Sequence, residues 1–206
     1  MEAAIASFAR HGFEGTTTAA VARSAGVTQP LVHRHFQSKQ GLWEAAMERV
    51  FDGAQFFENT LTDASPLQTV QHALRRFVIT CAENTVMHQI VVREANVDSE
   101  RLAHLVENYL GTQYADAVAN LRAAQSAGLM AKRISPELLV FLAVGAGSHL
   151  FSIGALAERA FGVDVRAPET REAFADLVVD VITRGVLVED ASPPPAARKG
   201  RSRKSS

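Results

Sequence analysis

Residues 12–39 read GFEGTTTAAVARSAGVTQPLVHRHFQSK and decide the fold that we predict for this chain. Thr17 can cap a short helix, and Gly26 allows the chain to reverse sharply where that helix ends. Thr28 is then expected to cap a second short helix that continues to about Phe36. The stretch therefore predicts two short helices joined by a tight turn.

A first helix over about residues 2–10, ended by Gly12, is expected to support this pair. The small core that joins the three helices is expected to comprise Ile5, Phe8, Val21, Val32 and Phe36, with Val27 filling the angle at the turn. The other side chains of the third helix then point away from the core. A DNA-recognition helix needs this arrangement, because its first side chains must reach base edges in the major groove.

The rest of the chain also reads as helical, because apolar residues recur every three or four positions and alternating strand patterns are almost absent. A fourth helix is expected to start after Ser38 and to extend toward Phe56 and Phe57, and residues 62–66 read as a linker. Further helices are predicted from Pro66 past Cys81 and over about 86–95, 99–127, 136–161 and 168–186. Their inward stripes are expected to include Val106, Tyr109, Leu177 and Val181.

These patterns predict an all-α fold of about nine helices. Residues 1–46 form a helix-turn-helix domain, and residues 47–190 form a larger helical domain. Residues 191–206 are rich in proline and basic residues, cannot form a core, and are predicted to be a disordered tail. The run RKGRSRK at 198–204 either adds weak attraction to DNA or keeps the chain soluble.

The composition excludes several classes of protein. The chain has 206 residues, a formal net charge of −1 and one cysteine, Cys81. This charge argues against a globally basic nucleic-acid coat but allows a local DNA-binding face. A single cysteine excludes an intramolecular disulfide and cysteine-rich zinc sites. No signal sequence and no uninterrupted apolar run of about 18 residues is present, so we expect a soluble, cytoplasmic protein without a membrane partner.

Three short motifs resemble those of the tetracycline-repressor (TetR) family of bacterial transcriptional regulators. They are GFEGTT at 12–17, AGVT at 25–28 and RHFQSK at 34–39, and they occur in the order and at the spacing that this family uses. The resemblance covers about residues 3–46. It implies an obligate homodimer in which the last two large helices of each subunit form a four-helix bundle. It also implies a ligand pocket among the middle helices and release of DNA when that pocket is filled.

The resemblance also implies roles for individual residues. Thr17 and Thr18 would contact the phosphate backbone, and His35 and Lys39 would hold phosphates, Lys39 beside the start of the fourth helix. Gln29 would read adenine and Pro30 would contact a thymine methyl group. The full DNA-contacting set that we predict is Thr17, Thr18, Thr28, Gln29, Pro30, Leu31, His33, Arg34, His35 and Lys39.

Two departures from the family pattern affect the expected DNA contacts. The family usually has a tyrosine that touches the DNA backbone where this chain has His33, whose side chain has a shorter reach. The chain also begins almost inside the first helix, without the basic arm that often precedes it. We therefore expect either fewer phosphate contacts or a start that has been assigned too late.

The residues of the larger domain suggest a pocket and an interface. Polar or aromatic residues within its helices make up the candidate effector pocket, which would favour a hydrophobic or aromatic ligand: His88, Arg93, Asn108, Tyr109, Tyr114 and His149. Small residues that allow two helices to approach, together with neighbouring apolar residues, make up the candidate dimer interface: Gly145, Gly147, Phe151, Gly154, Phe174, Leu177 and Val181.

Catalytic and metal-binding alternatives fit less well. His33 and His35 diverge by about 200° around a helix, so they do not form a metal site. The sequence GAGSH at 145–149 lies in a helix and lacks both a phosphate-binding lysine and a serine elbow. No convergent acid, base or nucleophile is evident, and we predict neither an enzyme nor a cofactor. The competing interpretations are a helical enzyme and a regulator or adaptor that binds no ligand.

We therefore predict a ligand-responsive DNA-binding regulator. The preferred mechanism is a repressor that a small hydrophobic or aromatic effector releases from a palindromic operator. At this point activation remains an alternative to repression, and the sequence identifies neither the operator nor the effector.

Overall fold

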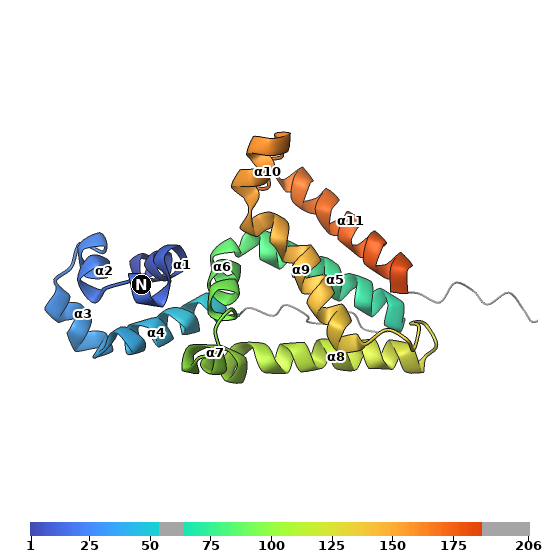
Figure 1. Ribbon diagram of the computed structural model, residues 1–206, viewed down its shortest axis with the longest axis horizontal. Coiled ribbons are helices and arrows are strands. Elements are labelled where there is room, and N and C mark those ends of the chain that lie inside the picture. Colours follow the sequence, from blue (N-terminus) through green and yellow to red (C-terminus); the bar gives the residue numbers. More distant parts are fainter. Residues whose placement is uncertain (54–63, 187–206) are drawn as a thin grey trace, which may run out of the picture.

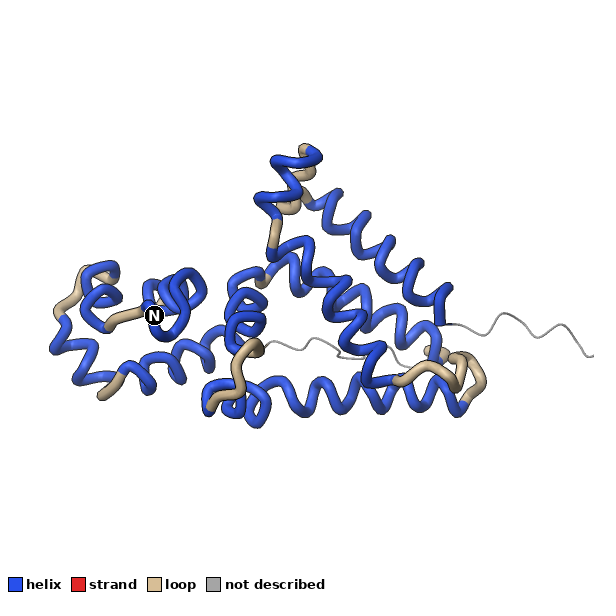
Figure 2. The backbone as a smooth tube through the Cα atoms, in the orientation of Figure 1, coloured by secondary structure: helices blue, strands red, loops and turns tan. Residues whose placement is uncertain are grey.

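The computed structural model describes residues 1–53 and 64–186, and within these ranges every regular element is a helix (Figure 1, Figure 2). The N-terminal group comprises α1 (Glu2–Gly15), α2 (Thr18–Ser24), α3 (Gln29–Phe36) and α4 (Lys39–Phe51). The C-terminal group comprises α5 (Pro66–Glu83), α6 (Thr85–Glu94), α7 (Glu100–Leu105), the π-helical turn η1 (Val106–Leu110), α8 (Gly111–Ser126), α9 (Pro136–Ser152), α10 (Gly154–Phe161) and α11 (Pro168–Val186).

This arrangement confirms the predicted all-α fold with an N-terminal helix-turn-helix and a larger helical domain. Figure 1 shows α1–α4 at one end of the molecule, with α4 leading toward the C-terminal group. The predictions for Phe56 and Phe57, for residues 62–63 of the linker and for the basic tail at 191–206 lie outside the described residues.

The N-terminal domain is built on a small apolar core that α1, α2, α3 and α4 share. Ile5, Phe8, Val21 and Val32 are buried, as expected, and Trp43 of α4 has no exposed surface. Phe36 is half-buried and packs against this core, also as expected. Val27 differs, because it is 40% exposed. Leu42, Ala46 and Met47 of α4 are buried as well, so α4 contributes more to this core than the sequence suggested.

The C-terminal domain is organised around α5, against which α8, α9 and α11 pack. Figure 1 shows α8, α9 and α11 as long helices that surround α5, with α10 at one corner. Val78 and Leu105 are fully buried in this core. The apolar stripe predicted for α5 therefore faces several helices at once.

The predicted single helix over 99–127 contains a π-helical turn. The turn spans Val106–Leu110 and joins α7 to α8 without a loop. An extra residue within a turn rotates the side chains that follow it around the helix axis. Val106, at the start of the turn and expected to face inward, is 44% exposed, whereas Leu105 and Leu110 are buried.

The predicted single helix over 136–161 is broken. α9 and α10 meet at Ile153 with a bend of 67°. Ser148 and Ser152 each donate a side-chain hydrogen bond to the carbonyl four residues earlier, a pattern that often bends helices. Among the described residues no single helix has the length and hydropathy to span a membrane; only α9 and α10 taken together pass that test, and they are bent.

The predicted dimer interface requires correction at several positions. Gly147 and Phe151 are buried within the subunit, where α9 packs on α5, and Gly154 lies against Val165. Phe174 is half-buried and packs edge-on against Phe151, with ring centroids 5.6 Å apart. The small residues of α9 thus allow close packing inside one chain.

Three members of the predicted interface are exposed in the subunit: Gly145, Leu177 and Val181. Leu177 and Val181 are 56% and 61% exposed, so they do not belong to the inward stripe of α11. That stripe comprises Ala175, Val178, Ile182 and Val186 instead.

Gly147→Val should destabilise the folded subunit. A Cβ at this position would lie 2.9 Å from Phe77 Cε1 and 3.0 Å from Val78 Cγ2, so α9 would have to move away from α5. We expect a loss of about 1–3 kcal/mol in the free energy of unfolding, measured with urea at one protein concentration. Gly185→Ala, where a Cβ meets nothing within 4 Å, is the matched control. Unchanged stability of Gly147→Val together with a shift toward monomer would restore the interface interpretation.

Candidate DNA-binding and effector sites

The turn between α2 and α3 is closed by backbone hydrogen bonds. Gly26 has φ +68°, a left-handed conformation that glycine adopts without strain. Its N–H donates to the carbonyl of Arg23 (3.2 Å), and the N–H of Val27 donates to the carbonyl of Ala22 (3.0 Å). This pair of bonds terminates α2 and turns the chain into α3 within four residues, Ala25 to Thr28.

The residues that begin α2 and α3 have different roles. Thr17 Oγ1 accepts a hydrogen bond from the Ala20 N–H (3.1 Å), so this hydroxyl caps α2 as predicted. Thr18 is half-buried beside it. Thr28 occupies the first position before α3 but makes no side-chain capping bond. The start of α3 is therefore held by the preceding turn and by Pro30 rather than by a side-chain cap.

α3 presents nearly all of its side chains to the outside. Among its eight residues, all of which the structure describes, Val32 alone is buried. Phe36 is half-buried, and the predicted contact residues Gln29, Pro30, Leu31, His33, Arg34 and His35 are exposed, as is Thr28. The structure thus places these predicted residues together on one projecting helix.

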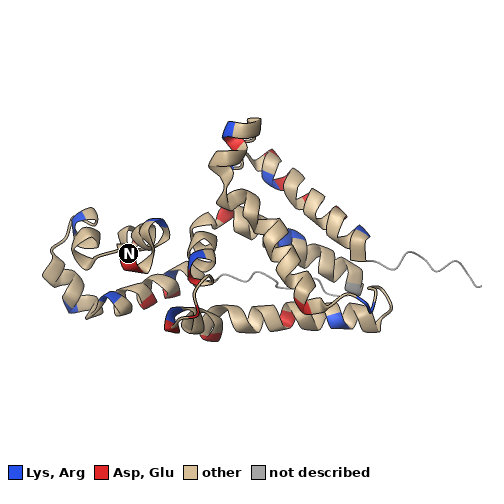
Figure 3. Ribbon diagram, viewed as in Figure 1, with Lys and Arg blue, Asp and Glu red and all other residues tan. Residues whose placement is uncertain are grey.

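The charged side chains in the stretch of sequence that contains α2 and α3 are all basic. Residues 15–43 include Arg23, Arg34 and Lys39 and contain neither aspartate nor glutamate. Figure 3 shows basic residues without acidic ones on the α2–α3 end of the molecule, whereas acidic residues appear along α4. A net charge near zero for the whole chain therefore coexists with a positive local surface.

Two members of the predicted DNA-contacting set, His33 and Lys39, have partners within the chain. His33 Nδ1 lies 3.1 Å from the carbonyl oxygen of Gln37, whose φ of +61° ends α3. Lys39 Nζ lies 4.3 Å from the ring centroid of Phe13 and 4.0 Å from Glu14 Oε2. The Lys39 ammonium group therefore has partners on α1, and its role as a phosphate ligand stays a prediction.

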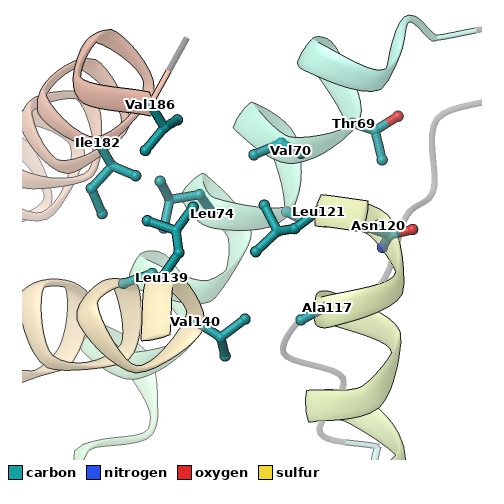
Figure 4. A pocket seen from close by; sticks show the side chains of 12 residues that line it. Thr69, Val70, Leu74, Ala117, Asn120, Leu121, Leu139, Val140, Ile182 and Val186 are labelled. Carbon is teal, nitrogen blue, oxygen red and sulfur yellow. The ribbon is translucent and has the colours of Figure 1, made fainter. Parts of the chain in front are cut away.

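A cavity of about 60 Å³ lies between α5, α8, α9 and α11 (Figure 4). Its walls are apolar except for Thr69 and Asn120. The lining residues are Thr69, Val70, Ala73, Leu74, Ala117, Asn120, Leu121, Leu139, Val140, Ala143, Ile182 and Val186. Figure 4 shows Leu74, Leu121, Leu139 and Ile182 pointing toward a common centre, with Asn120 at one side.

None of the six predicted pocket residues is among those that line this cavity. Tyr109 stacks on Phe51 with ring centroids 4.6 Å apart, and Tyr114 lies 5.9 Å from Phe141. Their rings fill helix–helix contacts, so they do not wall a common space. The residues that do line the cavity are apolar members of helical stripes, which a sequence cannot distinguish from ordinary core.

Of the remaining four predicted pocket residues, His88 and His149 lie near each other, whereas Arg93 and Asn108 have partners elsewhere. His88 is half-buried, and burial together with the neighbouring His149 lowers its pKa below the usual 6.5. Arg93 is exposed and donates to the Arg10 carbonyl (3.4 Å), and Asn108 donates to a carbonyl of its own helix. These side chains therefore do not form one binding site.

The segment that contains α1–α3 and the first part of α4 matches a known protein family. Residues 1–46 match the family model described as "Bacterial regulatory proteins, tetR family". Residues 1–46 are thus similar to the tetR family of bacterial regulatory proteins. The resemblance inferred from its motifs is thereby confirmed.

A curated relative, the "Probable HTH-type transcriptional regulator YttP" of Bacillus subtilis (strain 168), is 26% identical over 114 residues. The match covers 53% of this chain and 55% of the relative, so it spans about half of each protein. The matched tetR family and this relative are regulators, which supports the prediction that the chain is not an enzyme.

Solved structures share the fold of most of this chain. AibR, solved with isovaleryl coenzyme A and operator DNA, has a TM-score of 0.68 at 19% identity and covers 87% of this chain and 94% of its own. The ketosteroid transcriptional regulator KstR2 of Mycobacterium tuberculosis has a TM-score of 0.64 at 18% identity and covers 91% and 93%. Because the sequence identities are below 20%, these structures show that the fold is shared and nothing more.

Proposed function

We propose that this tetR-type chain is a homodimeric, ligand-responsive repressor that inserts α3 into the major groove of a palindromic operator. The observation that carries the proposal is the exposure of α3, which buries Val32 and leaves its other side chains accessible. Gln29 and Pro30, at its N-terminal end, would face base edges, with Gln29 reading adenine. Arg34 and His35 would contact phosphates on the same positive surface.

A second copy of the chain is proposed to cover an apolar face on α9 and α11. Leu138, Phe141 and Leu142 of α9 are 71%, 64% and 61% exposed, and Leu177 and Val181 of α11 lie on the exposed side of the adjacent helix. Monomeric proteins rarely expose so many large apolar side chains together. Two such helices from each subunit would bury this face in a four-helix bundle and would place two α3 helices on one duplex.

The effector is proposed to be a small hydrophobic or aromatic molecule that enters the cavity between α5, α8, α9 and α11. The present volume of about 60 Å³ is far below the roughly 300–1,000 Å³ of typical ligand sites. Binding would therefore have to separate these helices. A ligand that binds the separated form better shifts the population away from the form that matches the operator. AibR was solved with isovaleryl coenzyme A, and KstR2 is called a ketosteroid regulator. The isovaleryl group and the steroid skeleton are apolar, although coenzyme A itself is charged, so both neighbours support an effector with an apolar part.

Gln29→Ala and Arg34→Ala should weaken DNA binding in different ways. The test uses a DNA duplex that the wild-type protein has selected from a pool of duplexes of random sequence. Gln29→Ala should cost about 1–3 kcal/mol on the selected duplex and relax preference at one base pair, because it removes a base contact. Arg34→Ala should weaken binding to all duplexes and reduce the salt slope by about 1. Arg159→Ala on α10 is the control, and full affinity in both test variants would contradict the proposal.

Phe141→Asp should convert the dimer to a monomer, because it places a charge at the centre of the proposed apolar interface. Sedimentation velocity at micromolar concentration measures the outcome. Val97→Asp is the matched control, since Val97 is 63% exposed but lies in the connection between α6 and α7. A dimer that survives Phe141→Asp would exclude this face as the interface.

Ala117→Leu should prevent effector binding by filling the cavity, of which Ala117 forms part of the wall. The compounds to test are medium-chain alcohols and small aromatic hydrocarbons, with the shift in Tm as the measurement. A compound at about 100 times its Kd should stabilise the wild-type protein by roughly 2.7 kcal/mol and leave Ala117→Leu unchanged. Ala123→Leu, an exposed position on the same helix, should respond like the wild type. Equal responses of both variants would place the effector elsewhere.

A further inference from the structure

Arg101, near the start of α7, contacts the ends of two other helices. Its Nε donates a hydrogen bond to Glu94 Oε2 of α6 at 2.9 Å. Its guanidinium carbon lies 4.2 Å from the ring centroid of Phe13, and its terminal nitrogen lies 3.8 Å from Glu14 Oε1, both on α1. Arg101 thus links the N-terminal domain to the C-terminal domain.

The pair between Arg101 and Glu94 is largely shielded from water. The Glu94 side chain is 8% exposed and that of Arg101 is 23% exposed. A carboxylate buried to this extent needs a charged partner, so Glu94 fixes the position of the guanidinium group. The Glu14 side chain is 82% exposed, and its contact therefore contributes little. The guanidinium contacts that matter most are those with Glu94 and with the face of Phe13.

Phe13 receives a second cation from the DNA-binding domain. Lys39 Nζ, at the start of α4, lies 4.3 Å from the centroid of the same ring, and Phe8 stacks on that ring at 6.1 Å. Phe13 therefore connects α1, α4 and α7 at one point. Figure 3 shows basic and acidic residues close together where α6 and α7 approach this region.

A kink in α1 places Phe13 at this junction. Gly12 has φ +69° and ψ −179°, which interrupts the helix immediately before Phe13. A Cβ on Gly12 would lie 3.0 Å from Cδ of Arg93, whose guanidinium donates to the Arg10 carbonyl. The end of α1 is thus held by α6 on one side and by Arg101 on the other.

The segment that carries Arg101 continues directly into a wall of the proposed effector cavity. α7 runs through η1 into α8, which supplies Ala117, Asn120 and Leu121 to that wall. The same segment contacts α4 through the ring pairs His104–Trp43, at 5.6 Å, and Tyr109–Phe51, at 4.6 Å. A displacement of α8 would therefore be transmitted to the contacts that hold α1 and α4.

We propose that Arg101 is a positioning residue that fixes the orientation of the DNA-binding domain relative to the effector domain, by linking buried Glu94 to the ring of Phe13. This proposal rests on the proposed regulatory function, because it concerns how the effector domain controls α3. Loss of the guanidinium group should leave both domains folded but allow the N-terminal domain to sample several orientations.

The test compares Arg101→Gln with Arg75→Gln. Arg75 also pairs with two carboxylates, Glu172 and Asp176, but it joins α5 to α11 within the C-terminal domain. If a tenth of the molecules keep the competent orientation, Arg101→Gln should bind the selected duplex about tenfold more weakly. Arg75→Gln should bind like the wild type, and Arg101→Lys, which keeps the charge beside Glu94, should recover part of the affinity.

A distance measurement distinguishes positioning from a general loss of stability. Spin labels are attached to cysteines at Ala20 on α2 and Ala119 on α8, both exposed, and the labelled chain is mixed with excess unlabelled chain. Cys81 does not compete for the label, because it is buried and burial raises its pKa to about 12. We expect a narrow distance distribution in the wild type and in Arg75→Gln, and a broad one in Arg101→Gln.

A narrow distribution in Arg101→Gln, whether or not its Tm falls, would overturn the proposal. If Arg101→Gln does not fold because Glu94 is left unpaired, the double variant Arg101→Gln/Glu94→Gln removes that buried charge and should still show the broad distribution. The distance measurement needs no DNA. A wild-type protein that selects no duplex would therefore contradict the proposed function, while the distances would still decide the role of Arg101.

Discussion

α3 is attached to the core of the N-terminal domain through very little of its own surface, and this constraint determines what the domain can do. Val32 is its one buried side chain, and the turn at Gly26 fixes the direction in which the helix leaves α2. Because a short helix is not stable alone, the core beneath it must supply the order. Trp43, Leu42 and Phe8 provide that core from the two neighbouring helices. The remaining surface of α3 is therefore available for recognition without loss of the fold.

A buried aromatic contact between α4 and α7 joins the N-terminal domain to the rest of the chain. Trp43 belongs both to the core of the DNA-binding domain and to a ring contact with His104 of α7. Buried aromatic rings at such a boundary resist independent motion of the two sides, because separating them would expose apolar surface. An effector that alters the C-terminal domain would consequently act on α4 as well as on its own binding site.

Sequence patterns predicted the N-terminal domain in detail because its signals are local. A glycine at the turn, threonine and serine caps and a four-residue apolar spacing each depend on neighbours in the chain. Positions set by distant residues were harder to predict. Lys39 lies beside Phe13 of α1, which no local pattern indicates, and Gly147 packs on Phe77 and Val78 of α5.

In the C-terminal domain, the position of the cavity and the irregular turns within the helices were not predicted from the sequence. Leu74, Leu121 and Ile182 belong to ordinary apolar stripes, and only the packing of four helices leaves a space between them. Predicted pocket residues were chosen for polarity, yet polar side chains such as Asn108 are hydrogen-bonded to their own helix. The π-helical turn at Val106–Leu110 ends at Gly111, where a Cβ would lie 2.7 Å from the carbonyl oxygen of Val106, but a single glycine in an apolar helical pattern does not specify a π-helical turn.

Dimethyl sulfate footprinting of the wild-type protein on its selected duplex tests the central claim most directly, because this reagent methylates guanine N7 in the major groove and adenine N3 in the minor groove. The account predicts two clusters of protected guanine N7 atoms, related by dyad symmetry and about one helical turn, or roughly 34 Å, apart. Protection confined to adenine N3, or retardation of every duplex without a footprint, would contradict an α3 that reads the major groove.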